Sequence, residues 1–526
     1  SMATPSRGRP QVTNRIQLKR IKDRLKVLKP EELPVVVRIL IISTQKNISK
    51  IDFPGEEHSQ NPGFDGELIC QEGNGWVPSG HSVWELSVEK EVTDKATSDF
   101  SKRTLEIENR NQLSFVFVSN QEWRYKKKWQ DKHKSSGWKT VRCYNLSDLY
   151  QWLESSSVAQ LKLAEYFEFD DLPISTLDKH WKEWSRDGEY DLLQSESIFE
   201  TDIKRYNDEI SKFLKNDDSS VLKLFSASVE EALVFLFHIF NQQKYFTYKD
   251  RVIVFDSEIS LSSLMEAEDL HGYIAISYSD KTFEKLCYKK IQKIINISSI
   301  NESDLNIESH DEKMSTLVLD GSFNIHQKQD LFFFCGNSRN ALRRHLLKYP
   351  TSTCPEWAKD ETFGDEILPI ILIGYVNLDF HNDLGTTLVL TLSNIEKEEL
   401  EKRIKRLSKV DDTPVRLTKN ELIVLSKYDS LFLLKDRLSK TIVEDFISLC
   451  KKVFFKNPSN LTLELRDSLC ETYLILAQER YFKKYYYQEL GSLYNEIQIQ
   501  VDEGNNMAWS YMSKFCEAWP GLFLRI

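Results

Sequence analysis

Two carboxylates in the amino-terminal third of the chain have the residue types and spacing of a divalent-metal site. Asp65 lies in a Gly-Phe-Asp-Gly turn, and Glu85 ends a short Ser-Val-Trp run that follows a Pro-Ser-Gly turn and is predicted to be a strand. Two carboxylates on neighbouring strand ends can share one cation. Mg²⁺ is usually held by one or two carboxylates together with water and substrate phosphates. The pair therefore favours phosphodiester hydrolysis with Mg²⁺, or with Mn²⁺, over a zinc site.

Each carboxylate also has an ordinary structural explanation. Asp and Gly are common in hairpin turns because they tolerate the backbone angles, and a Glu at a strand end is often simply solvated. The next predicted element is a helix over residues 95–110, which places Lys95 and Asp99 one turn apart. Turn, strand and helix together favour the metal-site interpretation.

The segment from Leu33 to Leu153 resembles a known family. It is similar to the amino-terminal nuclease-like region of large prokaryotic proteins with STAND-type (signal-transducing NTPase) organisation, several relatives of which act in phage defence. The order of its acidic residues resembles the PD-(D/E)xK restriction-endonuclease-like fold. The resembling segments are LPVVVRILI, FPGEE…NPGFDG, WVPSGHSVWELS, KATSDFSKR and FVFVSNQEW…GWKTVRCYNLSDLYQWLE.

The resemblance implies roles for individual residues. In that family an Asp on one strand and a Glu-x-Lys on the next hold the metal and position the attacking water, which implies Asp65 and Glu85 as metal ligands. This chain departs from the pattern because Ser87 occupies the lysine position. Lys95, on the following helix, is then the implied replacement, and Lys90 is a weaker candidate.

The most basic segment of the chain is residues 122–142, which has eight Lys and Arg residues with three tryptophans and a tyrosine between them. Such a mixture is typical of a surface on which cations follow phosphates and rings cover bases. Alternatively, the tryptophans anchor a core and the lysines form a solvated face, and the sequence does not decide between the two. The predicted nucleic-acid-binding residues are Lys126, Lys127, Lys128, Trp129 and Lys132.

The composition is that of a globular protein. Of the 526 residues, 40% are hydrophobic and 29% charged, with a net charge of −10. We find neither an apolar run of about 18 residues nor a basic-then-apolar leader, so the sequence predicts a cytoplasmic protein without a membrane partner. Eight cysteines are spaced singly, with no zinc-binding pair. Residues 1–29 hold nine Lys and Arg against one acid, which predicts a basic arm.

The remaining chain predicts an α/β region and then helices. After a helical connector (166–218), strand and helix patterns alternate as in a P-loop NTPase, but the phosphate-binding motif is absent. The corresponding turn, Ser226–Glu231, lacks lysine and adds two acids, so no ATP is expected. Within helix 338–349, Arg343 and Arg344 are interpreted as a solvated face, with a nucleic-acid or domain contact as the alternative.

The predicted fold class is α/β, with five parts. They are a basic arm (1–29), a restriction-endonuclease-like α/β domain (30–165), the connector (166–218), a degenerate P-loop-NTPase-like α/β and winged-helix module (219–400), and a carboxy-terminal helical region (401–526).

Two functions remain open at this point. One is a Mg²⁺-dependent DNA endonuclease effector of a prokaryotic anti-phage defence system, with a second copy or other proteins as partners. The other is a catalytically inactive sensor or scaffold that binds nucleic acid or a partner. Geometry separates them, because a nuclease requires the carboxylates of Asp65 and Glu85 to converge with the Lys95 ammonium facing them.

Overall fold

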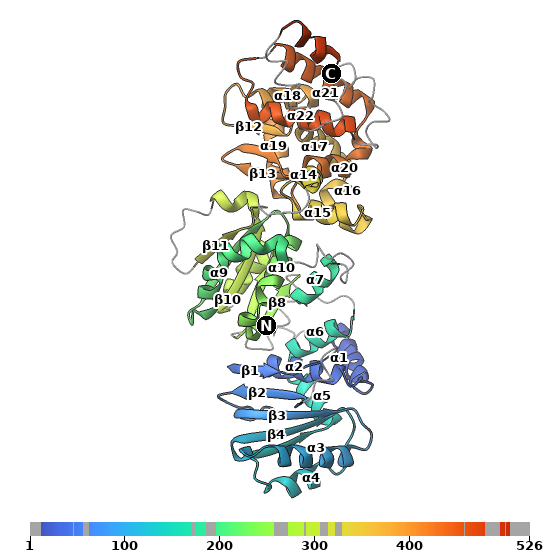
Figure 1. Ribbon diagram of the computed structural model, residues 1–526, viewed down its shortest axis with the longest axis vertical. Coiled ribbons are helices and arrows are strands. Elements are labelled where there is room, and N and C mark those ends of the chain that lie inside the picture. Colours follow the sequence, from blue (N-terminus) through green and yellow to red (C-terminus); the bar gives the residue numbers. More distant parts are fainter. Residues whose placement is uncertain are drawn as a thin grey trace, which may run out of the picture. The chain divides into compact units, whose positions relative to one another are not determined.

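The computed structural model in Figure 1 divides into two compact units, which are described separately. The first comprises residues 1–180, 216–221 and 236–296, and the second residues 181–215, 222–235 and 297–526. The structure describes residues 12–45, 47–55, 63–169, 174–185, 196–256, 272–288, 291–305, 314–320, 329–456, 458–478, 495–499 and 501–504. Within these ranges, no helix has an apolar stretch of the length that a bilayer requires.

The first unit begins with a five-stranded sheet in the order β1-β2-β3-β4-β5. Strand β2 pairs with β1 and with β3 in antiparallel orientation, whereas β4 pairs with β3 and with β5 in parallel. Figure 1 shows β1 to β4 side by side in this order. The strand bounds are β1 (Ile48–Asp52), β2 (Gly66–Cys70), β3 (Gly80–Ser87), β4 (Leu113–Ser119) and β5 (Thr140–Tyr144).

Helices cover both faces of this sheet because its strands alternate apolar side chains between two cores. One core joins Trp84 and Val116 to α1 (Val12–Leu25), α2 (Glu32–Thr44), α5 (Leu146–Glu154) and α6 (Ser157–Tyr166). The other joins Val83 and Phe115 to α3 (Val92–Glu106) and α4 (Lys126–His133). Successive residues of β3 and β4 thus face opposite cores, as the period of two of a strand requires.

Most local predictions for this region are confirmed. A short, apolar, β-prone run predicts a strand over 113–118, and this strand is β4. Residues 146–153 are predicted to form a helix with Asn145 or Ser147 near its cap; this helix is α5, and Asn145 caps it in a capping box with Asp148. The helix predicted at 95–110 is α3, but it begins at Val92 and ends at Glu106. Its N-cap residue makes no side-chain cap hydrogen bond, so the sequence carries no strong cap signal that would mark the true start.

Part of the predicted basic arm belongs to the domain. Residues 1–11 lie outside the described residues, but 12–25 form α1. Ile21 and Leu25 of this helix are buried in the same core as α2, and Arg24 forms an ion pair with Glu32 at 2.6 Å. The apolar face of α1 therefore docks it, and its described basic residues do not form a free tail.

A six-stranded sheet follows in the order β11-β7-β10-β9-β8-β6. Strands β8, β9 and β10 pair in parallel, and β6 pairs with β8 in antiparallel orientation. The alternation of strands and helices from residue 219 onward is the predicted one, and the α/β class is confirmed. The strands are β6 (Ile174–Ser175), β7 (Ser220–Ser226), β8 (Val252–Phe255), β9 (Ile274–Ser277), β10 (Lys293–Ser299) and β11 (Met314–Val318), and the helices include α7 (Leu177–Ser185), α9 (Glu200–Lys215), α10 (Val229–Phe240), α11 (Phe246–Lys249) and α13 (Asp280–Tyr288).

The predicted connector and its neighbours have different boundaries in the structure. Strand β6 lies within residues 166–218, so this segment contributes to a sheet besides carrying α7 and α9. The boundary expected at residue 400 falls inside α19 (Lys397–Lys409). Residue 400 is no division point, because Leu400, Ile404 and Leu407 continue one buried helical face.

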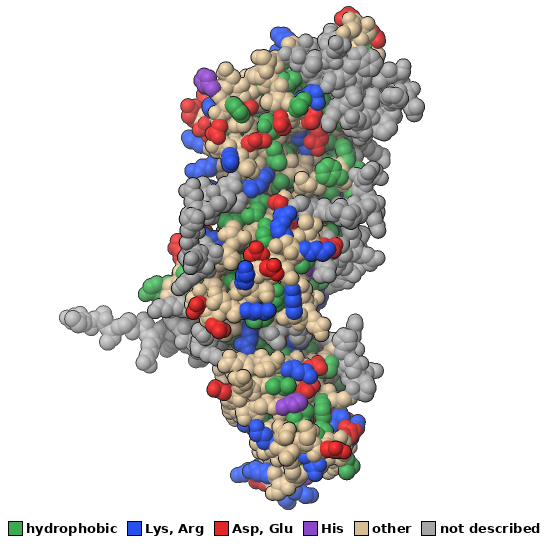
Figure 2. All heavy atoms as spheres, turned by 60° about the vertical axis from the view of Figure 1, so that its left-hand side comes forward, with side chains coloured by type: hydrophobic (Ala, Val, Ile, Leu, Met, Phe, Trp, Pro, Cys, Tyr) green, Lys and Arg blue, Asp and Glu red, His purple; other side chains and the backbone are tan. Residues whose placement is uncertain are grey.

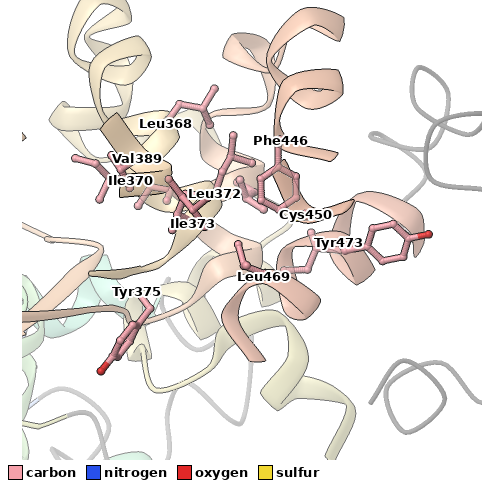
Figure 3. Packing of buried hydrophobic residues seen from close by; sticks show 14 of the residues in the cluster. Leu368, Ile370, Leu372, Ile373, Tyr375, Val389, Phe446, Cys450, Leu469 and Tyr473 are labelled. Atoms are coloured by element: carbon pink, nitrogen blue, oxygen red, sulfur yellow. The ribbon is translucent and has the colours of Figure 1, made fainter. Parts of the chain in front are cut away.

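The carboxy-terminal part of the second unit is built around α17, whose last two turns, residues 367–373, are apolar and buried on every side. Figure 3 shows its side chains with Val389, Phe446, Cys450, Leu469 and Tyr473 from surrounding helices. A small sheet of order β12-β14-β13 completes this part. The elements are α14 (Gln329–Cys335), α15 (Arg339–Leu346), α16 (Glu356–Lys359), α17 (Glu361–Ile373), β12 (Tyr375–Asn377), α18 (Leu384–Ser393), α19, β13 (Val415–Thr418), β14 (Glu421–Val424), α20 (Lys427–Leu433), α21 (Lys440–Lys456) and α22 (Leu463–Gln478).

Candidate functional site

The register of β2 and β3 brings the two predicted metal ligands together. Gly66 is paired with Trp84 in this antiparallel pair, so the preceding residue of one strand, Asp65, lies beside the following residue of the other, Glu85. The Leu86 amide donates to Asp65 Oδ2 at 2.9 Å, which fixes the Asp65 side chain at the strand end. The two carboxyl groups are within hydrogen-bonding reach of each other.

Glu85 is in an unusual electrostatic environment for a carboxylate. Its side chain is buried, with the residue only 3% exposed. Burial raises the pKa of Glu85 to about 8, the neighbouring Asp65 carboxylate adds to the rise, and the Arg103 guanidinium opposes it. Proton uptake by Glu85 avoids the repulsion between two buried carboxylates, and a cation between them would have the same effect.

Lys95 lies on the first turn of α3, near these carboxylates. Its ammonium is 3.2 Å from Asp99 Oδ1 and 3.8 Å from Glu89 Oε1. Burial by itself would lower the pKa of Lys95, but the carboxylates of Asp99, Glu89 and Asp65 together raise it, so this residue stays a cation. The structure thus places Asp65 beside Glu85, and Lys95, whose ion-pair partners are Asp99 and Glu89, is close enough to Asp65 for that carboxylate to raise its pKa.

Asp99 is a third carboxylate near this group. Burial raises its pKa and Asp65 adds to the rise, while Lys95 opposes it. Its Oδ2 atom is buried without a hydrogen-bond partner among the described residues. An acceptor of this kind is available to a ligand or a bound water.

The alternatives to Lys95 are placed less favourably. Lys90 is exposed to solvent. Ser87, at the family's lysine position, is buried, and its hydroxyl accepts from the Glu89 amide at 3.1 Å. This hydroxyl therefore stabilises the turn after β3.

Arg103 is a residue of this site that sequence reasoning missed. Its guanidinium donates to Glu85 Oε1, to the Gly63 carbonyl and, at 2.8 Å, to Glu106 Oε2. A usable signal was present, because Lys95, Asp99 and Arg103 recur every four residues and so share one face of a helix. That face is the one turned toward the strand ends.

The residues fit Mg²⁺ better than a metal that needs many protein ligands. The described part of the chain holds no group of three or more His, Cys, Asp or Glu side chains placed to bind one metal ion. Asp65 and Glu85 offer two converging carboxylates, which is the usual protein contribution to a Mg²⁺ site. Water and substrate phosphates supply the other ligands in such sites.

The predicted nucleic-acid-binding segment divides into a core side and a surface side. Lys127, Lys128 and Lys132 are exposed on α4, and Lys126 forms an ion pair with Asp148. Lys and Arg side chains are visible among acidic ones at the lower end of the molecule in Figure 2. Trp129 is 5% exposed and packs against Phe100, so its predicted role in stacking on bases is wrong for this conformation.

The tryptophans of residues 122–142 instead fasten this segment to α3. Each of the three indole nitrogens donates to a different threonine hydroxyl of that helix, at 2.8–3.0 Å; the pairs are Trp123 with Thr93, Trp129 with Thr97 and Trp138 with Thr104. Buried tryptophans usually satisfy their N–H group in this way. The interpretation of these residues as core anchors is therefore the one that the structure supports.

The turn in place of a phosphate-binding loop is occupied by the chain's own charged groups. The Val229 amide, at the start of α10, donates to Asp411 Oδ1 at 2.8 Å. Glu231 pairs with Arg339 at 2.7 Å and Glu230 with Arg343 at 3.3 Å. A helix N-terminus is a favourable place for an anion, and here a carboxylate of the same chain takes it.

The interpretation of Arg343 and Arg344 as a solvated face is wrong. Both are buried, and Arg343 also donates to the Trp184 carbonyl at 2.8 Å. Arg344 forms ion pairs with Asp412 and, at 2.7 Å, with Asp429. The sequence pattern alone favours a surface position for these arginines, because their acidic partners lie far away in the sequence.

No protein-family model matches this chain, and no curated protein matches it.

Proposed function

We propose that the amino-terminal domain is a Mg²⁺-dependent DNA endonuclease and the effector of a cytoplasmic prokaryotic anti-phage defence system. The observation that carries this proposal is the pairing of the Asp65 and Glu85 carboxylates at adjacent strand ends, with the Lys95 ammonium close by. Two carboxylates can hold the metal ion for hydrolysis of a phosphodiester, and an ammonium group can stabilise the negative charge that develops on the phosphate.

The residues of the site have separate roles in this proposal. Asp65 and Glu85 would hold Mg²⁺ or Mn²⁺, which supplies Lewis-acid chemistry and lowers the pKa of a bound water. Lys95 orients the attacking water and stabilises the negative charge that develops on the phosphate. Exposed lysines such as Lys127, Lys128 and Lys132 follow the DNA backbone, so binding weakens as salt rises.

The arrangement of elements supports the family resemblance. The two acidic residues come from consecutive antiparallel strands, the following helix α3 carries the lysine, and α3 connects two parallel strands. The strand–helix alternation around β7 and α10 supports a P-loop-NTPase-like layer. The order α17, β12, α18, α19 and the β13–β14 hairpin supports a winged-helix part.

One observation favours the alternative, a sensor or scaffold without catalysis. Ser87 replaces the family's lysine, and Arg103 already forms an ion pair with one of the two carboxylates. The deciding experiment incubates the full chain with supercoiled and linear DNA in Mg²⁺, in Mn²⁺ and in EDTA. Cleavage that depends on the metal supports the nuclease. If the DNA stays intact under all conditions, with the chain alone and with partner proteins, the sensor or scaffold is the function that remains.

We expect Lys95→Ala to lower the cleavage rate by roughly 10²- to 10³-fold, the loss typical of removing one stabilising donor. DNA affinity should change little, because the exposed lysines of α4 remain. Lys90→Ala is the matched control, since it removes a lysine close by in the sequence that is exposed to solvent. Initial cleavage rates and a filter-binding assay measure the two effects, and a parental rate for Lys95→Ala removes this residue from the site.

We also expect no useful ATP binding in residues 219–400. The turn after β7 offers no lysine to an incoming phosphate, and Glu230, Glu231 and the Asp411 carboxylate at the start of α10 would repel it. Calorimetric titration of the full chain with ATP and Mg²⁺ checks this. Micromolar binding that is lost on substitution of this turn contradicts the expectation.

A further inference from the structure

Arg103 connects the two chain segments that carry the proposed metal ligands. Its Nε atom donates to Glu85 Oε1 on β3, and its Nη2 atom donates to the carbonyl of Gly63, two residues before Asp65. Its guanidinium also lies over the ring of Phe64, with 4.8 Å from Cζ to the ring centroid. One side chain thus contacts both sides of the carboxylate pair.

The guanidinium itself is held in one orientation. Its third nitrogen, Nη1, donates to Glu106 Oε2 at 2.8 Å, one turn further along α3, and the residue is only 8% exposed. All three nitrogens therefore have different partners in different directions. A lysine has a single nitrogen and cannot reproduce this fork.

A fixed arginine matters here because it is the donor that orients Glu85. Asp65 and Glu85 lie side by side across the β2–β3 pair, and among the described residues Arg103 donates the hydrogen bond to the Glu85 carboxyl group. Asp65 is fixed by the Leu86 amide, but Glu85 depends on Arg103 for its orientation. Partners behind ligating groups commonly set metal affinity and activity in this way.

We propose that Arg103 is a positioning residue that holds the Glu85 carboxylate directly, and holds the Gly63–Phe64 turn that leads to Asp65, in the geometry that accepts a divalent cation. This inference rests on the proposed function. Arg103 itself does not contact the substrate in this role. The opposite role would be that of a competitor, in which the Arg103 charge neutralises Glu85 and keeps the metal ion from binding.

The test compares Arg103→Lys with Arg110→Lys in the full chain. Arg110 is a matched control because its guanidinium also holds a turn of this domain, by donating to the backbone carbonyls of Ser136, Thr104 and Ile107 at 3.3–3.5 Å. Mn²⁺ affinity is measured by calorimetry without DNA, and cleavage is measured across a series of Mn²⁺ concentrations. Circular dichroism of each variant reports folding.

We expect Arg103→Lys to weaken Mn²⁺ affinity by about 10- to 100-fold, with part of the cleavage rate restored at saturating Mn²⁺. Arg110→Lys should leave both quantities unchanged. A purely structural role would lower the rate at every Mn²⁺ concentration in the same proportion. Unchanged Mn²⁺ affinity in Arg103→Lys overturns the inference, and tighter Mn²⁺ binding also overturns it because it identifies a competitor.

A second variant decides the matter if Arg103→Lys does not fold. Glu106→Ala removes only the exposed partner of Arg103, and we expect it to weaken Mn²⁺ affinity by a few-fold while the domain stays folded. The same affinity as the parent overturns the inference. If the parent chain neither binds Mn²⁺ nor cuts DNA, the proposed function fails and the inference fails with it. If the parent binds Mn²⁺ and the variants bind it equally well, only the inference fails.

Discussion

Asp65→Asn and Glu85→Gln should each abolish metal-dependent cleavage of DNA while the domain remains folded. Either change removes one of two charges that hold the cation, so we expect a larger loss than the roughly 10²- to 10³-fold typical of removing one stabilising donor. Cleavage of plasmid DNA in Mg²⁺ and in Mn²⁺ measures the effect. A variant that cuts at the parental rate removes its residue from the site.

The fold should tolerate these changes because both retain the hydrogen bonds that the structure shows. The Asn carbonyl oxygen can accept from the Leu86 amide in place of Asp65 Oδ2, and the Gln carbonyl oxygen can accept from Arg103 Nε. Burial and Asp65 raise the pKa of Glu85 to about 8, so without metal this group is mostly protonated at pH 7 and Glu85→Gln replaces it with another neutral group. Thermal unfolding in EDTA should therefore show no loss of stability.

The control for this experiment is Glu67→Gln, the same chemical change on strand β2. The Glu67 carboxylate pairs with the Lys50 ammonium at 2.9 Å and lies 2.7 Å from His81 Nε2, so its partners are not those of the Asp65–Glu85 pair. We expect cleavage by this variant to stay close to the parental rate. A loss equal to that of Asp65→Asn would indicate that any charge change on β2 disturbs the site.

Arg339→Met is expected to lower the free energy of unfolding of the second unit by about 3–5 kcal/mol. Arg339 is completely buried and pairs with Asp202 at 2.5 Å and with Glu231 at 2.7 Å. Burial raises the pKa of both carboxyl groups, and Arg339 opposes this. Without the arginine, two acids are left without their cation in the interior.

Urea unfolding followed by circular dichroism and tryptophan fluorescence measures this effect. Lys204→Met on α9 is the control, because the Lys204–Glu200 pair is an exposed i,i+4 pair worth about 0.5 kcal/mol or less. A change below about 1 kcal/mol for Arg339→Met would show that this buried network contributes little. The triple change Arg339→Met, Asp202→Asn and Glu231→Gln should recover much of the loss, because no buried charge is then left alone.

The sequence by itself determined the local elements of this protein. Strand β4 follows from a short, β-prone apolar run, and α5 follows from its cap at Asn145 together with Asp148. The α/β class follows from the alternation of strand and helix patterns. These features depend on neighbours a few residues apart, which a sequence displays directly.

The residues of the candidate site are a prediction from the sequence, whereas the pairing of its two carboxylates is a feature of the tertiary structure. Turn, strand and helix signals, together with the family resemblance, name Asp65, Glu85 and Lys95 as candidates. The placement of Asp65 beside Glu85 depends on the register that pairs Gly66 with Trp84, and a slip by one residue would turn every side chain of the strand to the other face. Arg103 was missed because its partners, Glu85 and Gly63, are 18 and 40 residues away.

Only the tertiary structure decided which charged and aromatic side chains are buried. From the sequence, Trp129 is equally compatible with a base-stacking surface and with a core. In the structure its indole nitrogen donates to the Thr97 hydroxyl of α3, which places it in the core. Arg344 belongs to the interior because Asp412 and Asp429 reach it from distant segments. Burying a charge or an N–H group is unfavourable without a partner, and a sequence does not show which distant residue becomes that partner.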